Sequence, residues 1–518
     1  MKRVLLLLAL GTMLSVSIQA AVLNGQQKST AAQTASKKAA SPEPAKTDDK
    51  KAEDCGCEVK APPDVLATVD GTNVSVKEID EPIKDRIQAL QDQVIEARKR
   101  ELDLQINSQL LEAEAKRLGT TSDKLLEREI VSKVKQPADA EAQAFYEQNK
   151  SRIEGSFADV KDQIIGYLRA QREKEEAGKY ADRLRARAQV KVLSQEVTPP
   201  QSEADRARVF ATVNGKRVTS AEIEDALKPL IFAVQEQVYN LRKQRLDLKI
   251  NDILLEREAQ KRNMTGTQLF DAEVLPRVKP VTEDSARKYY EENRNRMPAG
   301  YAQLRGQIIQ YLQNRERNNA ESAYADQLRK STAVQVFLKM PDPPVFDIAI
   351  EGRPWKGGAN AAVTIVEFTD YECPSCGSTQ PVLEEVVKEF GDKVKLVARN
   401  FPLDQHKHAF KAAEAAEAAR EQGKYWEYTA LLFRNQKALE VDDLKNYATE
   451  LGLDRRKFDA ALDSGRLAEK VKQDLADGNK IGVDSTPSVF INGKRLRERK
   501  PEDFRAAIEA ALKDAGKK

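Results

Sequence analysis

Cysteine, histidine and tryptophan are all scarce in this sequence of 518 residues. It contains four cysteines, two histidines and two tryptophans, and aromatic residues make up only 6% of the chain. So few cysteines cannot form a disulfide scaffold in a chain of this length. They occur as two close pairs, Cys55 with Cys57 and Cys373 with Cys376, and this spacing indicates chemistry rather than cross-linking.

The chain also lacks an excess of charge of either sign. Lysine and arginine number 85 and aspartate and glutamate 82, which leaves a net charge of +3. No basic block stands out, so there is no electrostatic reason to expect binding to nucleic acid. Charged residues make up 32% of the chain and the mean hydropathy is −0.61, a composition typical of soluble and largely helical domains. The length predicts about three domains.

Long apolar runs are missing beyond the N-terminus. Residues 1–20 combine a basic start, Met1–Arg3, with an apolar core, Val4–Val16, and an acceptable cleavage site before Ala21, which predicts a signal peptide. A retained membrane anchor is the alternative, although the apolar run is short for a span. No cysteine follows the run directly, which argues against a lipoprotein. We therefore predict an exported protein that is periplasmic or otherwise extracytoplasmic after signal peptide cleavage, where disulfides persist.

Residues 21–62 are rich in Ala, Lys, Ser, Pro and Asp and show no apolar periodicity, which predicts a disordered linker. Cys55 and Cys57 lie in this linker as a Cys-Gly-Cys pair. The pair is a candidate accessory redox site, a soft-metal site or a vicinal disulfide, or it carries no function. Two thiolates without a nearby histidine make a weak metal site.

The main organisational feature is an internal repeat with a shift of 144 residues, which relates Val65–Gly71 to Val209–Gly215. Further matches at the same shift are Leu102–Leu104 with Leu246–Leu248, Asn107 with Asn251, Tyr146 with Tyr290, Gln163–Ile165 with Gln307–Ile309, and Tyr180–Asp182 with Tyr324–Asp326. The register continues without a gap. We therefore predict a duplicated domain, with copy 1 at residues 63–197 and copy 2 at residues 208–338.

Each copy opens with the signals of a β-hairpin followed by helices. The Asp-Gly pair at 70–71 and the Asn-Gly pair at 214–215 lie between β-branched residues and predict tight turns. The capping boxes Ser75–Glu78 and Thr219–Glu222 then start helices. One apolar helical stripe consists of Leu102, Ile106, Leu110 and Ala113.

Each copy also closes on a short β-like run, Val190–Val192 in copy 1 and Val334–Val336 in copy 2. We expect each run to pair with the opening hairpin and so to fasten its unit. Pro199-Pro200 marks the linker between the copies, and Met340–Pro344 and Gly357-Gly358 mark the passage into the last domain. No residue cluster in either copy is typical of a catalytic site.

The repeated pattern resembles the N-terminal chaperone domain of SurA and related PpiC-type proteins. The segments that carry it are ATVDG and ATVNG, LLEAEAKRLG and LLEREAQKRN, FYEQN and YYEEN, and QIIGYL and QIIQYL. The resemblance implies domains that hold unfolded exported proteins, and passive spacer or dimerisation helices are the alternative. No segment remains for a parvulin domain, and the only histidines, His406 and His408, lie far downstream. We therefore expect no prolyl isomerase activity.

The last domain, predicted at residues 350–516, is organised around Cys373-Pro374-Ser375-Cys376. An apolar run from Thr364 to Phe368 predicts a strand that leads into the motif, and Gly377–Phe390 has the pattern of a helix. The helix N-terminus favours a thiolate at Cys373. This arrangement suits dithiol–disulfide exchange, whereas a zinc site would need a second Cys or His pair at suitable spacing.

Thr486-Pro487, which precedes a second apolar run, supports the redox interpretation. A cis peptide bond at Thr486-Pro487 beside the dithiol would expose backbone for an incoming strand. The later order of elements is a strand from Val394 to Arg399, helices, a strand from Ser488 to Ile491 and a closing helix from Pro501 to Leu512. This is the order of a thioredoxin-type α/β fold with a helical insertion.

The segment from about residue 355 to about residue 515 resembles the DsbA-like thioredoxin family. The matching segments are TIVEFTDYECPSC, NFPLDQHKHAFKAAEAAEAA, QGKYWEYTALLF and GVDSTPSVFINGK. The resemblance implies that Cys373 is the nucleophile, Cys376 the buried resolving thiol and Pro487 the cis-proline, with Pro374, Ser375 and Thr486 in supporting positions. It also matches Glu367 to a buried acid that shuttles protons for the resolving thiol. The alternative for Glu367 is an exposed strand carboxylate.

One position departs from the strongest oxidants of that family, because Ser375 replaces a histidine that would stabilise the thiolate. Asp370 and Glu372 place negative charge nearby, which disfavours a thiolate. We therefore expect a weaker oxidant than DsbA, nearer the isomerase or reductase range. His406 and His408 have the pattern of ordinary helix-start residues, and Trp355 and Trp426 are expected to pack on the domain.

Taken together, the sequence predicts a multidomain protein with two mainly α-helical repeats followed by an α/β thioredoxin fold. We expect a thiol–disulfide oxidoreductase that needs no cofactor or metal. Its expected partners are unfolded or cysteine-containing exported proteins, together with a membrane or periplasmic redox protein that resets the dithiol. The alternative is a holdase or scaffold whose dithiol is only regulatory.

Overall fold

The computed structural model describes residues 62–150, 153, 155–294, 297 and 299–516. The predicted signal peptide at 1–20 and the Cys55 and Cys57 pair lie outside the described residues. The described residues separate into two compact units. The first unit contains Ile95–Ile231 and residues 343–516, and the second contains residues 62–94 and Phe232–Asp342.

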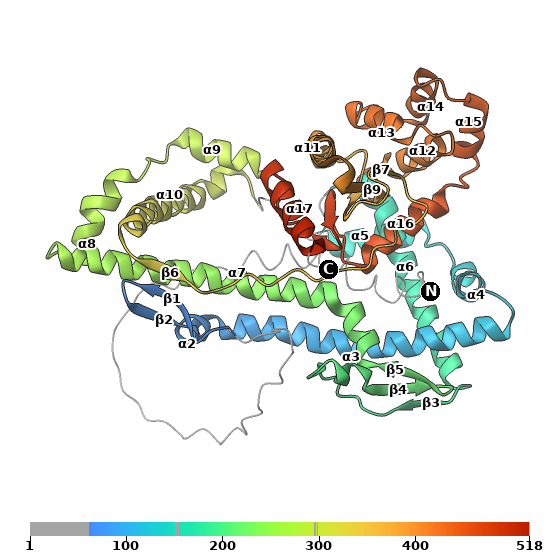
Figure 1. Cartoon of the computed structure of the whole chain (residues 1–518), viewed down its shortest axis with the longest axis horizontal. Helices are drawn as coiled ribbons and strands as arrows, with labels where there is room; N and C mark the ends of the chain where they lie inside the picture. Colours follow the sequence, from blue (N-terminus) through green and yellow to red (C-terminus); the bar gives the residue numbers. More distant parts are fainter. Residues whose placement is uncertain (1–61, 151–152, 154, 295–296, 298, 517–518) are drawn as a thin grey trace. The chain divides into compact units, whose positions relative to one another are not determined.

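The part of the chain before residue 343 is mainly helical, and the remainder is an α/β domain (Figure 1). Helical segments of the first part are α2 (Val76–Asp80), η1 (Glu81–Ile83), α3 (Lys84–Arg117), α4 (Ser122–Glu129), η2 (Val131–Lys133), α5 (Asp139–Asn149), α6 (Phe157–Arg185), η3 (Ala204–Ala207), α7 (Ser220–Lys261), α8 (Gly266–Leu269), η4 (Phe270–Val274), η5 (Leu275–Arg277), α9 (Glu283–Glu292) and α10 (Tyr301–Ser331). Its strands are β1 (Val65–Val69), β2 (Thr72–Ser75), β3 (Val190–Val192), β4 (Val209–Val213), β5 (Lys216–Thr219) and β6 (Val334–Val336).

The predicted turns and helix starts of the two copies are confirmed. Asp70, Gly71, Asn214 and Gly215 all have positive φ, as a two-residue hairpin turn of the primed type requires. Ser75 caps α2 by accepting a hydrogen bond from the N–H of Glu78. Of the predicted helical stripe, Leu102, Ile106 and Leu110 are buried, whereas Ala113 is exposed.

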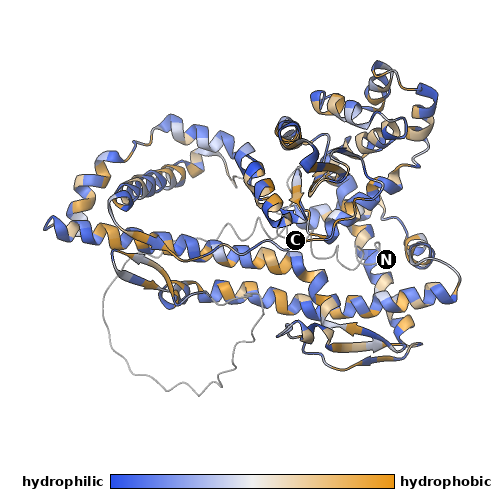
Figure 2. Cartoon of the chain, in the orientation of Figure 1, coloured by the Kyte–Doolittle hydropathy of each residue, from blue (hydrophilic) through white to orange (hydrophobic). Residues whose placement is uncertain are grey.

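The long helices of the two copies differ in continuity, although α7 also contains a proline, Pro229. In copy 2, α7 runs without a break from Ser220 to Lys261. The equivalent residues of copy 1, 76–117, are divided into α2, η1 and α3. Pro82 lies at the start of η1, where it removes one backbone donor from the helix, and the matching position of copy 2 is Ala226. In Figure 2 apolar patches alternate with polar ones along both long helices.

The expected pairing of each closing strand with the hairpin of its own copy is wrong. β3 of copy 1 pairs antiparallel with β4, which opens copy 2, in the sheet β3-β4-β5. β6, which closes copy 2, pairs antiparallel with β1, which opens copy 1, in the sheet β2-β1-β6. The hairpins are thus exchanged between the copies.

The hydrophobic cores follow the same exchange. In the first unit the copy 2 hairpin residues Phe210, Ala211, Val213 and Val218 are buried against Leu102, Ile106 and Leu110 of α3. In the second unit the copy 1 hairpin residues Leu66, Ala67, Val69 and Val74 are buried against Leu246, Ile250 and Leu254 of α7. Every residue of one set corresponds to a residue of the other at the shift of 144. The sequence pattern is satisfied equally by either partner, and the structure selects the exchanged one.

The α/β domain is built on a five-stranded sheet in the order β11-β10-β8-β9-β7. Its strands are β7 (Trp355–Gly357), β8 (Val363–Thr369), β9 (Val394–Asn400), β10 (Ser488–Ile491) and β11 (Lys494–Arg495). Its helical segments are α11 (Pro374–Phe390), η7 (Gly391–Lys393), α12 (Ala409–Glu421), α13 (Tyr425–Arg434), α14 (Val441–Glu450), α15 (Arg455–Asp463), α16 (Ala468–Lys480) and α17 (Pro501–Ala515). The predicted order of strands and helices, with α12–α16 inserted between β9 and β10, is confirmed.

Two sequence expectations about the edge of this domain need correction. Gly357 and Gly358 do not belong to a linker, because they lie against the backbone of the segment that leads into β9. A Cβ on Gly357 would be 2.4 Å from the carbonyl oxygen of Val394, so only glycine fits. Trp355 is 46% exposed rather than packed, whereas Trp426 contacts two hydrophobic clusters and donates from Nε1 to the carbonyl of Trp355 at 3.1 Å.

Within the described residues, no helix has both the length and the apolar composition needed to cross a membrane.

Candidate active site

The structure places the two cysteines where β8 ends and α11 begins. Cys373 is the N-cap of α11, and Pro374 occupies the first turn, where its missing N–H leaves no hydrogen bond unmade. Both cysteines are free thiols and both are buried, Cys373 with 6% of its surface exposed and Cys376 with none. The predicted strand, turn and helix around the dithiol are confirmed.

Cys373 is the more acidic thiol of the pair. Hydrogen bonding from Cys376 lowers the pKa of Cys373 most, burial opposes this, and hydrogen bonds from Thr486 and from the N–H groups of Ser375 and Cys376 lower it further, to about 5. When protonated, its Sγ donates to the carbonyl oxygen of Thr486 at 3.4 Å. At neutral pH Cys373 is therefore a thiolate, the nucleophilic form.

Cys376 has the opposite character. Burial raises the pKa of this thiol well above its ordinary value, and the neighbouring Cys373 and the charge of Glu367 raise it further. Its Sγ accepts a hydrogen bond from the N–H of Asp370 at 3.4 Å. The two thiols thus differ strongly in acidity, as expected of one attacking and one resolving group.

Glu367 is a buried acid, so its alternative interpretation as an exposed strand carboxylate is wrong. It lies on β8, opposite Ala398 of β9 and Val489 of β10, and is 1% exposed. Burial raises the pKa of Glu367 to about 7, against hydrogen bonds from Gln380 and Thr369 and the charge of Lys356. Gln380 Nε2 donates to its two carboxylate oxygens at 2.8 and 3.0 Å.

The peptide bond between Thr486 and Pro487 is cis, as predicted. Ser488 follows directly as the first residue of β10, which pairs antiparallel with β8 at Phe368. The Thr486 carbonyl accepts a hydrogen bond from Cys373, so the segment before β10 lies beside this cysteine. The structure therefore brings together Cys373, Cys376, Glu367 and the cis bond, although they span more than 110 residues of sequence.

Asp370 and Glu372, the two acids that the sequence analysis placed near the dithiol, each lie beside a histidine that the sequence analysis had not assigned to them. Asp370 Oδ2 lies 2.8 Å from His406 Nδ1, and Glu372 Oε1 lies 3.3 Å from His408 Nδ1. His408 is the N-cap of α12, as expected of a helix-start residue, but both rings also contact an acid next to the motif. This pairing was not recognisable in the sequence, because the partners are 36 residues apart.

Gln436 is a further residue that the sequence did not reveal. Its Nε2 donates to the carbonyl of Tyr371 at 3.0 Å and to that of Cys373 at 2.7 Å, which holds the turn that contains Cys373. Gly377 makes room for this side chain, since a Cβ there would lie 2.6 Å from Gln436 Oε1. In the sequence, only the glycine directly after the motif, Gly377, indicated that another side chain packs closely there.

No group of three or more His, Cys, Asp or Glu residues that could hold a metal ion occurs in the described part of the chain.

One protein family matches the α/β domain. A family model described as Thioredoxin matches residues 350–510. Residues 350–510 form a thioredoxin-like domain. The match covers this domain only, so the resemblance of the two copies to the SurA and PpiC N-terminal domain stays a prediction.

Two curated relatives are sodium/proton antiporters. NhaA 1 of Mycolicibacterium gilvum is 38% identical over 188 residues, which covers 36% of this chain and 29% of the relative. NhaA of Herminiimonas arsenicoxydans is 40% identical over 168 residues, which covers 32% of this chain and 26% of the relative. The chain thus spans less than a third of the length of these relatives.

Similar solved structures also cover about a third of the chain. BdbD from Bacillus subtilis is 26% identical with a TM-score of 0.31, over 33% of this chain and 100% of that chain. A thioredoxin-like oxidoreductase from Silicibacter pomeroyi is 27% identical with a TM-score of 0.30, over 32% of this chain and 94% of that chain. The catalytic domain of Proteus mirabilis ScsC is 19% identical with a TM-score of 0.28, over 32% of this chain and 93% of that chain.

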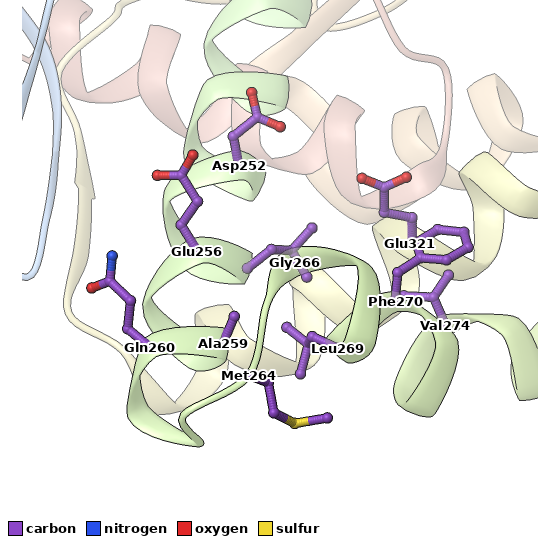
Figure 3. Close-up of a pocket in the computed structure, with 11 residues that line it drawn as sticks. Asp252, Glu256, Ala259, Gln260, Met264, Gly266, Leu269, Phe270, Val274 and Glu321 are labelled. Atoms are coloured by element: carbon purple, nitrogen blue, oxygen red, sulfur yellow. The ribbon is translucent and has the colours of Figure 1, made fainter.

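A second candidate site is a cavity of about 360 Å³ in the second unit (Figure 3). Its apolar lining includes Leu255, Met264, Leu269, Phe270 and Val274. Carboxylates also line it: Asp252 and Glu256 come from α7, and Glu321 of α10 lies across from them in Figure 3. An apolar cavity with acidic groups suits an apolar side chain that is flanked by basic residues.

Proposed function

We propose that this protein is a thiol–disulfide oxidoreductase that acts on cysteine-containing proteins. The observation that carries the proposal is the contrast between the two thiols, with the pKa of Cys373 lowered to about 5 and that of Cys376 strongly raised. A stable thiolate at Cys373 is a good leaving group. A thiol that stays protonated at Cys376 does not attack until its proton is removed.

In the oxidising direction, a client thiolate attacks the Sγ of Cys373 in the disulfide form. The bond between Cys373 and Cys376 breaks, and Cys376 leaves as a thiolate that takes up a proton. A second client thiolate then attacks the client sulfur of the mixed disulfide, and Cys373 leaves as its stable thiolate. Two electrons pass from the client to the dithiol, and the same steps in reverse describe reduction.

Glu367 is the proposed proton donor to Cys376. The negative charge of Glu367 contributes to the raised pKa of Cys376, and this supports the proposal. Its own pKa of about 7 leaves it partly protonated near neutral pH, so it can give a proton and regain one. The proposed function of Thr486 and Pro487 is to present backbone groups to an extended client segment.

Refolding of reduced ribonuclease in a glutathione buffer tests the enzyme proposal. We expect Cys373→Ala to abolish the acceleration, and Cys376→Ala to accumulate a client adduct that dithiothreitol releases. Reactivation by Cys373→Ala at the wild-type rate would rule out the enzyme and leave the rival function, a holdase or scaffold with a regulatory dithiol.

We further propose that the helical units bind unfolded clients and that the protein works in an extracytoplasmic space, where a separate redox protein resets the dithiol. The cavity of the second unit supports the client-binding part. We expect the full chain with Cys373→Ala to suppress aggregation of a reduced basic client, and Glu321→Lys to weaken this suppression. Glu175→Lys, on an exposed helical site that does not line the cavity, is the matched control. Equal suppression by both variants would remove the cavity from the proposal.

A further inference from the structure

Asp370 connects the dithiol to a residue far along the chain. Its backbone contacts both cysteines, because its carbonyl accepts from the N–H of Cys373 at 3.2 Å and its N–H donates to Cys376 Sγ at 3.4 Å. Its side chain is fully buried. The backbone of Asp370 is therefore fixed beside both cysteines, and its carboxylate is buried on the same residue. An uncompensated negative charge near Cys373 would disfavour its ionisation.

Three donors satisfy this buried carboxylate. The N–H of Glu372 donates to Oδ1 at 2.8 Å, and the N–H of Leu403 donates to Oδ2 at 2.8 Å. The third contact is the ring of His406, whose Nδ1 lies 2.8 Å from Oδ2. Of these three, only the imidazole can bring a positive charge.

His406 is held on the loop between β9 and α12. Its N–H donates to the carbonyl of Leu403 at 3.0 Å, and 21% of its side chain is exposed. Burial lowers the pKa of His406, but the hydrogen bond and charge of Asp370 raise it, followed by the charges of Cys373 and Glu372, and the net pKa is raised. An interaction that favours the imidazolium beside the thiolate favours the thiolate equally.

We propose that His406 is a positioning residue for the dithiol, which acts through Asp370 to place positive charge beside the Cys373 thiolate. The effect of His406 on the pKa of Cys373 does not depend on the proposed function, whereas its effect on disulfide exchange does. His406 supplies from a distant loop the charge that Ser375 cannot provide within the motif. The charged groups that act on His406 are Asp370, Cys373 and Glu372. Its own loop also carries the titratable residues Asp404, Lys407 and His408.

Alkylation of the reduced full chain by iodoacetamide, measured from pH 3.5 to 9, tests the proposal. The rate of modification of the Cys373 peptide, followed by mass spectrometry so that Cys55 and Cys57 do not contribute, reports the thiolate fraction of Cys373, because Cys376 stays protonated. We expect His406→Gln to lower the rate at pH 4.5 about three- to tenfold, which corresponds to a rise of roughly half to one unit in the pKa of Cys373. At pH 8 the variant and the wild type should react at similar rates, whereas a merely structural defect would change the rate at every pH.

Two further variants make the experiment decisive. Lys407→Gln removes the same charge from the adjacent residue, which is 79% exposed, and should leave the titration unchanged. The double variant Asp370→Asn with His406→Gln removes both charges and should recover most of the low-pH rate. A wild-type titration in His406→Gln, an equal shift in Lys407→Gln, or no recovery in the double variant would each overturn the proposal. Failure of the ribonuclease assay with a normal thiol titration would instead refute only the proposed function.

Discussion

Arg98 of copy 1 forms a buried ion pair with Glu224 of copy 2, in which Arg98 Nε donates to Glu224 Oε1 at 2.6 Å and Nη2 donates to Oε2 at 3.1 Å. The residues at the shift of 144 repeat this pair in reverse. Arg242 of copy 2 donates to Asp80 of copy 1 at 2.9 and 2.8 Å. The reciprocal pairs lie at the two places where the copies exchange their hairpins, so charge and apolar packing specify the same pairing.

The Arg98 pair is expected to contribute strongly to stability. The two side chains are only 1% and 10% exposed, so removal of the arginine leaves a buried carboxylate without its bidentate partner. We expect Arg98→Met to lower the free energy of unfolding by about 3 kcal/mol in urea denaturation followed by circular dichroism. Arg98→Met combined with Glu224→Leu should recover most of the loss, and a double variant as unstable as the single one would contradict this account.

The exchange also predicts the behaviour of copy 1 expressed without copy 2. Residues 62–197 contain a hairpin and a closing strand whose observed partners both belong to copy 2. Because corresponding residues line both exchanged cores, two such fragments can satisfy each other. We expect a concentration-dependent dimer in light scattering. A folded monomer in which Val190–Val192 pairs with Val65–Val69 would show that exchange is not required.

The acidity of Cys373 predicts how the reduction potential depends on pH. Reduction consumes two protons below pH 5, the pKa of Cys373, and one proton above it. The slope should therefore change from about 60 to about 30 mV per pH unit near pH 5, as measured by equilibration with glutathione. At pH 7 we expect a potential between that of thioredoxin, about −270 mV, and that of DsbA, about −120 mV. A value as oxidising as that of DsbA would refute the weaker-oxidant interpretation.

Above about pH 7, the buried Glu367 should lower the free energy of unfolding, although it supports disulfide exchange. Its pKa of about 7 exceeds its ordinary value of 4.5, so the fold favours the protonated acid. The contribution of protonated Glu367 to the free energy of unfolding is fully present below pH 4.5 and is lost as the pH rises through 7. We expect Glu367→Gln to raise the free energy of unfolding at pH 8 by up to about 3 kcal/mol, with little change at pH 4.

The same substitution should slow disulfide exchange, because glutamine cannot donate a proton to Cys376. We expect a loss of about tenfold or more in the rate of ribonuclease reactivation at pH 7. Glu389→Gln, which changes an acid on α11 that pairs with Arg505, is the control for a general charge effect. A faster or unchanged rate in Glu367→Gln would remove it as the proton donor.

Local features were predictable from the sequence because neighbouring residues decide them. The turns at Asp70-Gly71 and Asn214-Gly215 follow from residues that tolerate positive φ, and Pro374 follows from the unpaired N–H groups of a helix start. The burial of Glu367 could be suspected only from a resemblance, since the alternation of a strand leaves both faces open until its neighbours are known.

Tertiary structure decided the choices between equivalent or distant partners. The hairpins of the two copies have the same apolar pattern, so the sequence of Val190–Val192 does not determine which of them it pairs with. The ion pairs of Arg98 and Arg242 both join one copy to the other, in agreement with the exchanged pairing. His406 reaches Asp370 only because the loop after β9 returns to the end of β8. The sequence by itself determined the duplicated helices and the reactive turn at Cys373, because both depend on short-range periodicity and capping. Strand exchange and the charge beside the thiolate depend on long-range contacts, which only the folded chain creates.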